Sequence, residues 1–324
     1  MSFDCSVIVP VHNKEPVVRR CLESVAEQTR TPAEVIVVDD ASTDGSTLIA
    51  REYCERYGWL LLERSVPGAG GYAARNAGVR ASNCEWLAFL DADDEWFPEH
   101  LATVERLTRF DYSMAATNWI NSTGKGWKVN DFADRFSGRD AFGLSANRFL
   151  RIQDRGLNPV HTNTVLVRKA LFEQVGGFPE HCRRGGDVAT WMRLVVQAGG
   201  LAVSPATTAV YHREASGIVR TVPAETSGNC VHRAVCDFLV DPPRNVSVYR
   251  LKRFSNIHLR FAIRKRLFTG KLRPRDLRAW FVGVAPLEAL RYYLLSATRG
   301  RNQRVLFIAS NMVGDLFRSV LCRA

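Results

Sequence analysis

Two aspartates that follow an apolar run offer the clearest chemistry in the chain. Asp91 and Asp93 come directly after residues 86–90, a stretch with the composition of a buried strand. Carboxylates two positions apart can bind a hard divalent cation such as Mg²⁺ or Mn²⁺, with water and substrate phosphate completing the coordination. The alternative is an exposed acidic turn that caps the helix expected from Pro98 onward. The position behind a buried strand favours the cation site.

A second acidic pair, Asp39 and Asp40, ends the apolar run 34–38. These carboxylates can accept hydrogen bonds from a nucleotide base or ribose, or they can cap the next helix; for Asp40 both interpretations stay open. Arg75 lies in the helix expected before residues 86–90. It can pair with a phosphate or be an ordinary solvated arginine.

Two further candidates lie in the second half of the chain. Asp187 follows Arg183-Arg-Gly-Gly186 and begins a helix expected over residues 187–198. Its carboxylate can act as a general base or as a structural N-cap. His212 follows the strand-like run 209–211 and can ligate a metal, although a lone histidine usually has another role.

These candidates need a sheet to hold them. Apolar runs at 6–10, 34–38, 59–62 and 86–90 alternate with helical patterns at 16–28, up to about 57, 72–81 and 98–110. Alternating strands and helices predict an α/β fold with a mostly parallel sheet flanked by helices, and its ligands bind beyond the carboxyl ends of the strands. The two acidic pairs should therefore share one edge of the sheet. Residues 121–159 fit either an acceptor-side insertion or a surface excursion.

Composition and cysteine usage point to a cytoplasmic protein. The 324 residues are 46% hydrophobic and 24% charged, as in ordinary globular proteins. No uncharged apolar run is long enough for a transmembrane helix, and the first ten residues lack the basic region of a signal peptide. None of the eight cysteines forms a Cys-x-x-Cys pair, so we expect free thiols in a reducing compartment.

Charge divides the chain into two parts. Residues 1–220 carry 25 Lys+Arg and 27 Asp+Glu, whereas residues 221–324 carry 19 and 6. We expect a catalytic domain over 1–220 and a basic helical region over 221–324 with an anionic partner. No zinc spacing or RNP-like run is present, so no nucleic acid is expected. The other candidate is the inner membrane face, to which the protein would bind peripherally.

The helix expected over residues 249–268 is apolar on two sides. One stripe holds Leu251, Phe254, Ile257, Phe261 and Phe268, and the opposite stripe holds Leu259, Ile263 and Leu267. Such a helix needs two partners, of which one is the domain over residues 1–220 and the other is lipid or a neighbouring helix. The alternative is that the region only packs on protein and exposes a solvated basic face.

Six motifs occur together in a fixed order: Ser6-Val-Ile-Val-Pro-Val-His-Asn13, Glu34-Val-Ile-Val-Val-Asp-Asp-Ala-Ser-Thr-Asp-Gly-Ser46, Ala74-Arg-Asn-Ala-Gly78, Leu87-Ala-Phe-Leu-Asp-Ala-Asp-Asp94, Gly176-Gly-Phe178 and Gly186-Asp-x5-Arg193. In this combination the chain resembles family 2 glycosyltransferases of the GT-A fold, over residues 6–213. The resemblance implies a Rossmann-like sheet with a C-terminal helical extension.

The resemblance also implies roles for the site residues. On the donor side, Pro10 and Asp39 contact the nucleotide base, and Arg75 lies near the base or the diphosphate. Asp91 approaches the ribose, and Asp93 binds the divalent cation, Mn²⁺ or Mg²⁺.

On the acceptor side, the resemblance makes Asp187 the catalytic base and His212 a further metal ligand. The implied reaction is an inverting transfer from a nucleotide-diphosphate sugar, most often a UDP-sugar, to a glycan or lipid-linked acceptor. One position departs from the family, which often has Glu before the base where this chain has Gly186. The rival hypothesis is therefore a non-catalytic nucleotide-sugar-binding or scaffolding protein.

Overall fold

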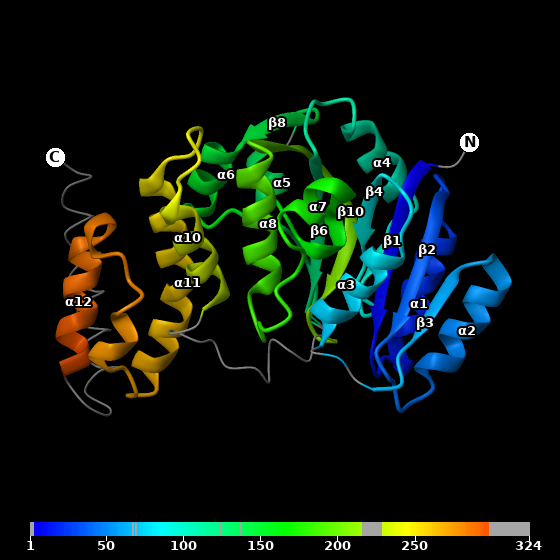
Figure 1. The fold of residues 1–324 in the computed structure, drawn as a ribbon, viewed down its shortest axis with the longest axis horizontal. Helices are drawn as coiled ribbons and strands as arrows, with labels where there is room; N and C mark the ends of the chain where they lie inside the picture. Colours follow the sequence, from blue (N-terminus) through cyan, green and yellow to red (C-terminus); the bar gives the residue numbers. More distant parts are fainter. Residues whose placement is uncertain are drawn as a thin grey trace. The chain divides into compact units, whose positions relative to one another are not determined.

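The computed structural model describes residues 3–66, 68, 70–123, 125–136, 138–215 and 229–297. The chain forms two compact units. One comprises Met1–Thr221 with Pro243–Val246, and the other comprises Val222–Pro242 with Ser247–Ala324. The first unit holds the sheet (Figure 1).

The sheet is parallel in one half and mixed in the other. Its strands run in the order β3-β2-β1-β4-β9-β6-β10-β5, with β7 beside β6 and β8 beside β10. The strands β1 (Phe3–Val11), β2 (Pro32–Asp39), β3 (Leu60–Glu63) and β4 (Trp86–Phe89) are parallel to one another, as are β6 (Met114–Ser122) and β10 (Gly200–His212). The antiparallel strands are β5 (Glu95–Trp96), β7 (Trp127–Val129), β8 (Phe142–Ser145) and β9 (Val165–Arg168). The α/β architecture agrees with the prediction. Strand β7 runs antiparallel to β6 because the loop between them is too short for the crossover that parallel strands need.

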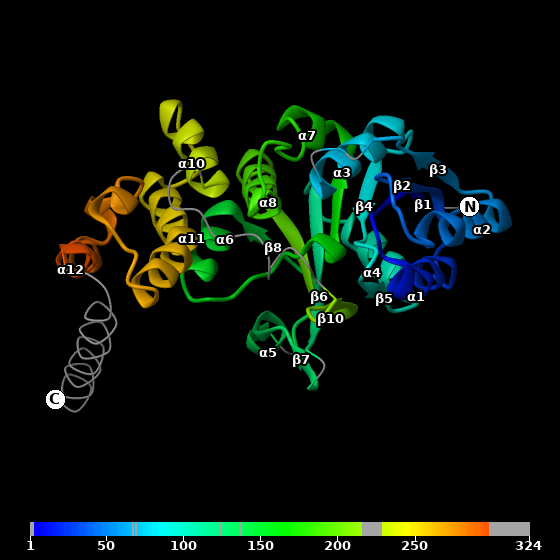
Figure 2. The same cartoon turned by 90° about the horizontal axis from the view of Figure 1, so that it is seen from below.

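Helices cover both faces of this sheet (Figure 2). On one face lie α1 (Glu15–Ala26), α2 (Ser46–Tyr57) and α4 (His100–Leu107), which share a core with Val7 and Val9 of β1. On the other lie α3 (Gly71–Ala81), α7 (Lys169–Gln174) and α8 (Gly186–Gln197). Gly78 lets α3 approach β1 closely, because a Cβ there would lie 2.5 Å from Ile8.

Residues 121–159 have secondary structure of their own. They include β7, α5 (Asp131–Phe136), β8 and α6 (Ala146–Gln153). Phe132 and Phe149 are buried, whereas Trp127 is 63% exposed. The segment therefore contributes to the core of the first unit and is more than a surface excursion.

The second unit is helical throughout its described residues. It contains α10 (Cys230–Val240), α11 (Val248–Phe268), η2 (Pro274–Leu277), η3 (Val282–Val284) and α12 (Pro286–Ala297). Leu259, Ile263 and Leu267 lie in its core, as the second apolar stripe of α11 predicts. The first stripe is buried only near the start of α11, because Phe261 is 57% exposed. Within the described residues, no helix has both the length and the apolar character needed to span a bilayer.

The cysteine expectation holds in part. Cys5, Cys21, Cys54, Cys84 and Cys236 are free thiols. Burial raises the pKa of the Cys5 and Cys21 thiols well above the ordinary value, so both stay protonated inside the core. The expectation was wrong for Cys182 and Cys230, which are not free thiols.

Candidate functional site

The acidic pairs meet at one edge of the sheet. Asp39 ends β2 opposite Val11, the last residue of β1, and β4 pairs with β1 on its other side. Two residues in the adjoining loops, Asn13 and Ala41, have positive φ angles of 50° and 58°. Non-glycine residues in the left-handed region concentrate at functional sites, where surrounding structure holds the strain.

Asp39 is 3% exposed and accepts hydrogen bonds from the hydroxyl groups of Ser42 and Thr47. It does not cap α2, whose N-cap position is Gly45. Its carboxylate instead holds the loop between β2 and α2. Pro10 lies on β1 directly before Val11, the register partner of Asp39.

Asp40 is also buried, and it joins two loops. Its carboxylate accepts a hydrogen bond from the Gly68 N–H at 2.9 Å and lies 3.2 Å from the Arg64 guanidinium. Its backbone carbonyl lies 2.9 Å from His12 Nδ1. The helix-cap interpretation therefore fails for both members of the pair.

Arg75 is not a solvated arginine. It is 8% exposed, forms an ion pair with Asp91, and lies over the rings of Tyr72 and Phe178 at 5.8 and 5.4 Å. Burial acts to lower the pKa of this guanidinium, but the charge of Asp91 outweighs it and the pKa is raised. Arg75 therefore stays charged, and its ion pair with Asp91 holds it at the sheet edge.

Three carboxylates that follow β4 lie close together. Oxygen atoms of Asp91, Asp93 and Asp94 all lie within 4.8 Å of one another. Asp94 is fully buried, and its pKa is raised well above the ordinary range by burial and by the charges of Asp93 and Asp91. Three hard oxygen donors suit Mg²⁺ or Mn²⁺. The exposed-turn interpretation is wrong, because Asp93 is only 9% exposed and the N-cap of α4 is Glu99.

His212 lies next to this cluster through its backbone. Its N–H donates to Asp94 at 2.9 Å. Its ring nitrogens face carboxylates, Nε2 at 2.9 Å from Glu95 and Nδ1 at 3.1 Å from Glu214. Metal ligation by the ring stays a prediction, and it requires one of these two carboxylates to move away.

Asp187 lies in the first turn of α8, whose N-cap is Gly185, so it is not the cap. The Tyr72 hydroxyl donates to Asp187 Oδ1 at 3.3 Å and accepts the Gly186 N–H at 3.0 Å. A Cβ at Gly186 would lie 2.7 Å from the Tyr72 ring. Tyr72 thus occupies the space beside the backbone where the side chain of the family's usual glutamate would begin.

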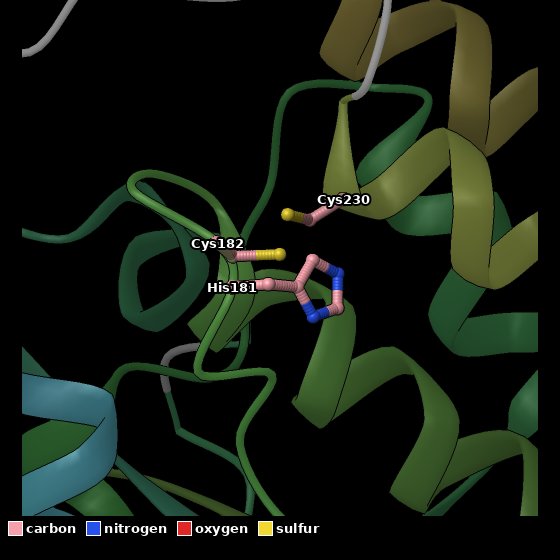
Figure 3. Close-up of side chains that lie close together, drawn as sticks. All are labelled: His181, Cys182 and Cys230. Carbon is pink, nitrogen blue, oxygen red and sulfur yellow. The ribbon is translucent and has the colours of Figure 1, made fainter. Parts of the chain in front are cut away.

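The loop that leads into α8 contains a tight turn. Figure 3 shows His181 and Cys182 on this loop. The Cys182 N–H donates to the Pro179 carbonyl at 3.0 Å, and the Cys182 side chain is buried while His181 is exposed. This turn lies shortly before Gly186, where α8 begins.

Sequence reasoning missed several residues that contact the predicted site, and Lys14 and Tyr72 are two of them. Lys14 places its ammonium 2.6 Å from Asp93. Tyr72 contacts Asp187, as described above. Lys14 directly follows the first motif and Tyr72 lies one helical turn before Arg75, so proximity to a motif was the available signal.

With this geometry in view, comparison with known proteins identifies the family. A model described as glycosyl transferase family 2 matches residues 6–173. The chain belongs to this family. It is similar to the glycosyltransferase AglE of Haloferax volcanii, with 32% identity over 200 residues that cover 60% of this chain. The chain spans 62% of the length of that relative.

Solved structures show the same fold as this chain. The chain is similar to S. aureus TarS 1–349 in complex with UDP-GlcNAc, with a TM-score of 0.69 and 21% identity over 92% of this chain and 82% of that one. It is also similar to the mannosyltransferase PcManGT from Pyrobaculum calidifontis in complex with GDP-Man and Mn²⁺, with a TM-score of 0.54 and 21% identity over 97% and 81% of the two chains. The architecture is therefore GT-A.

Proposed function

We propose that this family 2 glycosyltransferase transfers a sugar, with inversion, from a UDP-sugar to an acceptor hydroxyl in a metal-dependent reaction. One observation carries the proposal. A continuous set of contacts joins the predicted base to the predicted donor site, from Asp187 through the Tyr72 hydroxyl to the overlying Arg75 and its partner Asp91. These contacts support one site for the proposed base and the proposed donor-binding groups.

In the proposed mechanism Asp187 accepts the proton of the acceptor hydroxyl as the hydroxyl oxygen attacks the anomeric carbon. The bond from that carbon to the diphosphate oxygen breaks, and the single displacement inverts the anomeric configuration. Asp39 and Pro10 contact the base of the donor, and Arg75 stabilises the negative charge of the diphosphate. Asp93 and neighbouring carboxylates would hold Mn²⁺ or Mg²⁺, which supplies Lewis-acid neutralisation of the leaving diphosphate.

The substrate class and the location are part of the proposal. Solved structures of this fold contain UDP-GlcNAc in one case and GDP-Man with Mn²⁺ in another, which supports a nucleotide-sugar donor. We propose a glycan or lipid-linked acceptor in polysaccharide or glycolipid assembly. We also propose a catalytic domain over residues 1–220, and a basic region over 221–324 that binds the inner face of the membrane from the cytoplasm.

Turnover separates this proposal from a nucleotide-sugar-binding scaffold. The purified chain is screened by thermal shift against UDP-, dTDP- and GDP-sugars with Mn²⁺, since a ligand at a hundred times its Kd adds about 2.7 kcal/mol of stability. Release of free nucleotide by transfer or slow hydrolysis is then measured with and without chelation. We expect stabilisation by UDP-sugars and turnover that is lost after chelation or in Asp93→Ala. Binding without any turnover would favour the scaffold, and full activity after chelation and dialysis would refute metal dependence.

A further inference from the structure

A histidine that no motif includes lies at the same edge of the sheet. His161 is the N-cap of η1 (Thr162–Thr164), a turn that contacts β4, β6 and β10 just before β9 begins. Its ring packs against two aromatic rings, Trp119 at 5.1 Å and Tyr211 at 4.5 Å between centroids. Trp119 is buried, so it gives the imidazole a fixed contact. Packing against the two aromatic rings therefore holds the imidazole in position.

A chain of hydrogen bonds also determines which ring nitrogen carries the proton. The Asn163 amide nitrogen donates to Asp94 at 3.0 Å and faces the Val210 carbonyl at 3.4 Å. The Asn163 Oδ1 must then face His161, whose Nδ1 lies 2.7 Å away. An amide oxygen only accepts, so the short 2.7 Å contact favours a hydrogen on Nδ1 and a lone pair on Nε2. The Asn163 backbone N–H also approaches Nδ1, but at the longer distance of 3.5 Å.

The Nε2 atom of His161 is open to solvent. Within the described part of the chain, His161 Nε2 makes no hydrogen bond and is not among the buried nitrogen atoms without a partner, so solvent reaches it. The turn that carries His161 reaches the acidic cluster after β4, because the Asn163 side-chain amide of the same turn donates to Asp94 at 3.0 Å. Burial is the main cause of the lowered pKa of His161, so the ring stays neutral and can accept a hydrogen bond.

The sheet order separates this position from the predicted base-binding residues. Asp39 lies at the end of β2, on the far side of β1 from β4, whereas Trp119 and Tyr211 lie on β6 and β10 beyond β9. His161 therefore lies on the opposite side of the Asp91–Asp93 segment from Asp39. A group on that side is placed to contact the acceptor rather than the nucleotide of the donor.

We propose that His161, supported by Trp119 and Tyr211, forms a subsite for the acceptor, in which Nε2 accepts a hydrogen bond from a hydroxyl of a pyranose ring. This hydroxyl neighbours the one that Asp187 deprotonates, so His161 selects and orients the acceptor. The proposal rests on the proposed transferase function and names the chemistry of its second substrate. A neutral acceptor nitrogen beside aromatic rings suits an uncharged sugar ring, which offers hydroxyl donors and an apolar C–H face.

The test compares His161→Phe, which keeps an aromatic ring but no acceptor, with His161→Gln, which restores an acceptor atom. The probes are octyl β-D-glucopyranoside and octyl β-D-galactopyranoside, with a UDP-sugar that the wild type hydrolyses. We expect His161→Phe to raise KM for the glycoside roughly tenfold with little change in kcat, as for a lost uniform binding interaction. His161→Gln should recover part of the affinity. UDP affinity, hydrolysis of the donor by water and a His181→Phe control should stay at wild-type values.

A spectroscopic measurement tests the same proposal without any acceptor. Long-range ¹H–¹⁵N correlation spectra, with His161→Gln to assign the signal, should show a neutral Nδ1–H tautomer at pH 7. An Nε2–H tautomer, an unchanged KM in His161→Phe, or a wild type that hydrolyses the donor but glycosylates neither probe would overturn the subsite. A wild type that binds no nucleotide sugar and hydrolyses none would instead contradict the proposed function.

Discussion

The Lys14 ammonium lies 2.6 Å from the Asp93 carboxylate, the side chain proposed to hold a divalent cation. The same ammonium is 3.4 Å from the Ala215 carbonyl, so it has a second oxygen partner nearby. Lys14 is 26% exposed at its side chain and Asp93 is 13% exposed, so the pair is only partly screened by water. A divalent cation that binds at Asp93 must either displace the Lys14 ammonium or bind more weakly because that ammonium repels it.

Removing this ammonium should therefore strengthen cation binding. We expect Lys14→Met to lower the Kd for Mn²⁺ in the presence of UDP by about tenfold, equivalent to about 1.4 kcal/mol of relieved competition. Isothermal titration calorimetry measures this directly. Arg19→Met is the matched control, because Arg19 pairs with Glu52 on the surface, away from Asp93. An unchanged or weaker Mn²⁺ affinity in Lys14→Met would mean that the ammonium does not compete with the metal.

The proposed base makes a quantitative prediction. Asp187→Asn should lower turnover roughly 10²–10⁴-fold while UDP binding survives, because the amide cannot accept the proton. Tyr72→Phe removes the hydroxyl that contacts Asp187 and Gly186 but keeps the ring that fills the space beside Gly186. For Tyr72→Phe we expect a smaller loss of turnover, roughly tenfold, because the Asp187 carboxylate loses its hydrogen-bond donor. Near-normal turnover in Asp187→Asn would remove Asp187 from the mechanism.

The order of elements around the donor side could be predicted from the sequence because local signals agree there. Apolar runs that end in acidic pairs predict β2 and β4, and parallel pairing then places both pairs at one edge. The burial of Asp39 and Arg75 could not be predicted. It depends on partners distant in sequence, such as the contact of Arg75 with Phe178, which only the folded chain brings together.

The acceptor side was less predictable for a physical reason. His161 and Asn163 stand in a turn with no helical or strand periodicity, and their roles depend on hydrogen bonds to Asp94 and packing against Tyr211. No spacing rule encodes such contacts. In α11 the pattern predicted two apolar stripes with separate partners, and Phe261 of the first stripe is exposed. Helical periodicity shows which residues share a face but not what covers that face.

Donor recognition can be separated from loop stability at Asp39. Asp39→Ala should weaken UDP-sugar binding at least tenfold if the carboxylate contacts the base. The same change removes the acceptor for Ser42 and Thr47, which could loosen the loop. Ser42→Ala is the control, since it removes a loop contact and leaves the carboxylate. Equal Kd values for every nucleotide sugar in Asp39→Ala would leave Asp39 with the loop role alone.

A buried histidine predicts part of the acid sensitivity of the fold. His100 is fully buried, stacks on Trp96 at 4.2 Å and lies 2.8 Å from the Thr208 hydroxyl. Burial lowers the pKa of His100 to about 3. In the unfolded chain His100 takes up a proton near pH 6.5, whereas in the folded chain it stays neutral down to about pH 3. The free energy of unfolding therefore falls as the pH drops from about 6.5 towards 3. The loss of unfolding free energy that His100 causes approaches about 1.4 kcal/mol for each pH unit.

The His100→Phe variant isolates this contribution. Phenylalanine can keep the stacking on Trp96, and the Thr208 hydroxyl retains the Thr117 hydroxyl at 2.6 Å. Urea unfolding at pH 7, 6, 5 and 4 compares the two proteins, and the other titrating groups cancel in the difference. We expect the unfolding free energy of the variant to rise relative to that of the wild type as the pH falls below 6.5. A difference that is constant across this range would show that His100 does not cause the loss of stability in acid.

The second unit should bind anionic membranes through two features that occur together. Residues 221–324 carry 19 basic and 6 acidic side chains. On α12, Leu287, Leu290 and Leu294 are 82%, 57% and 64% exposed and recur at helical spacing, so they form an apolar stripe. Each Lys or Arg near an anionic surface contributes about 1 kcal/mol, and inserted leucines add hydrophobic transfer free energy. Neither feature requires a membrane-spanning helix.

Sedimentation of the full chain with vesicles tests this combination. Binding should require phosphatidylserine or phosphatidylglycerol and should weaken between low and high salt, because surface charges are screened. Replacing Leu287, Leu290 and Leu294 together by Ser should reduce the bound fraction at both salt concentrations, whereas Leu48→Ser, at a 68% exposed position of the first unit, should not. If the protein stays in the supernatant with every vesicle composition, the basic face is solvated and the leucine stripe serves a protein contact instead.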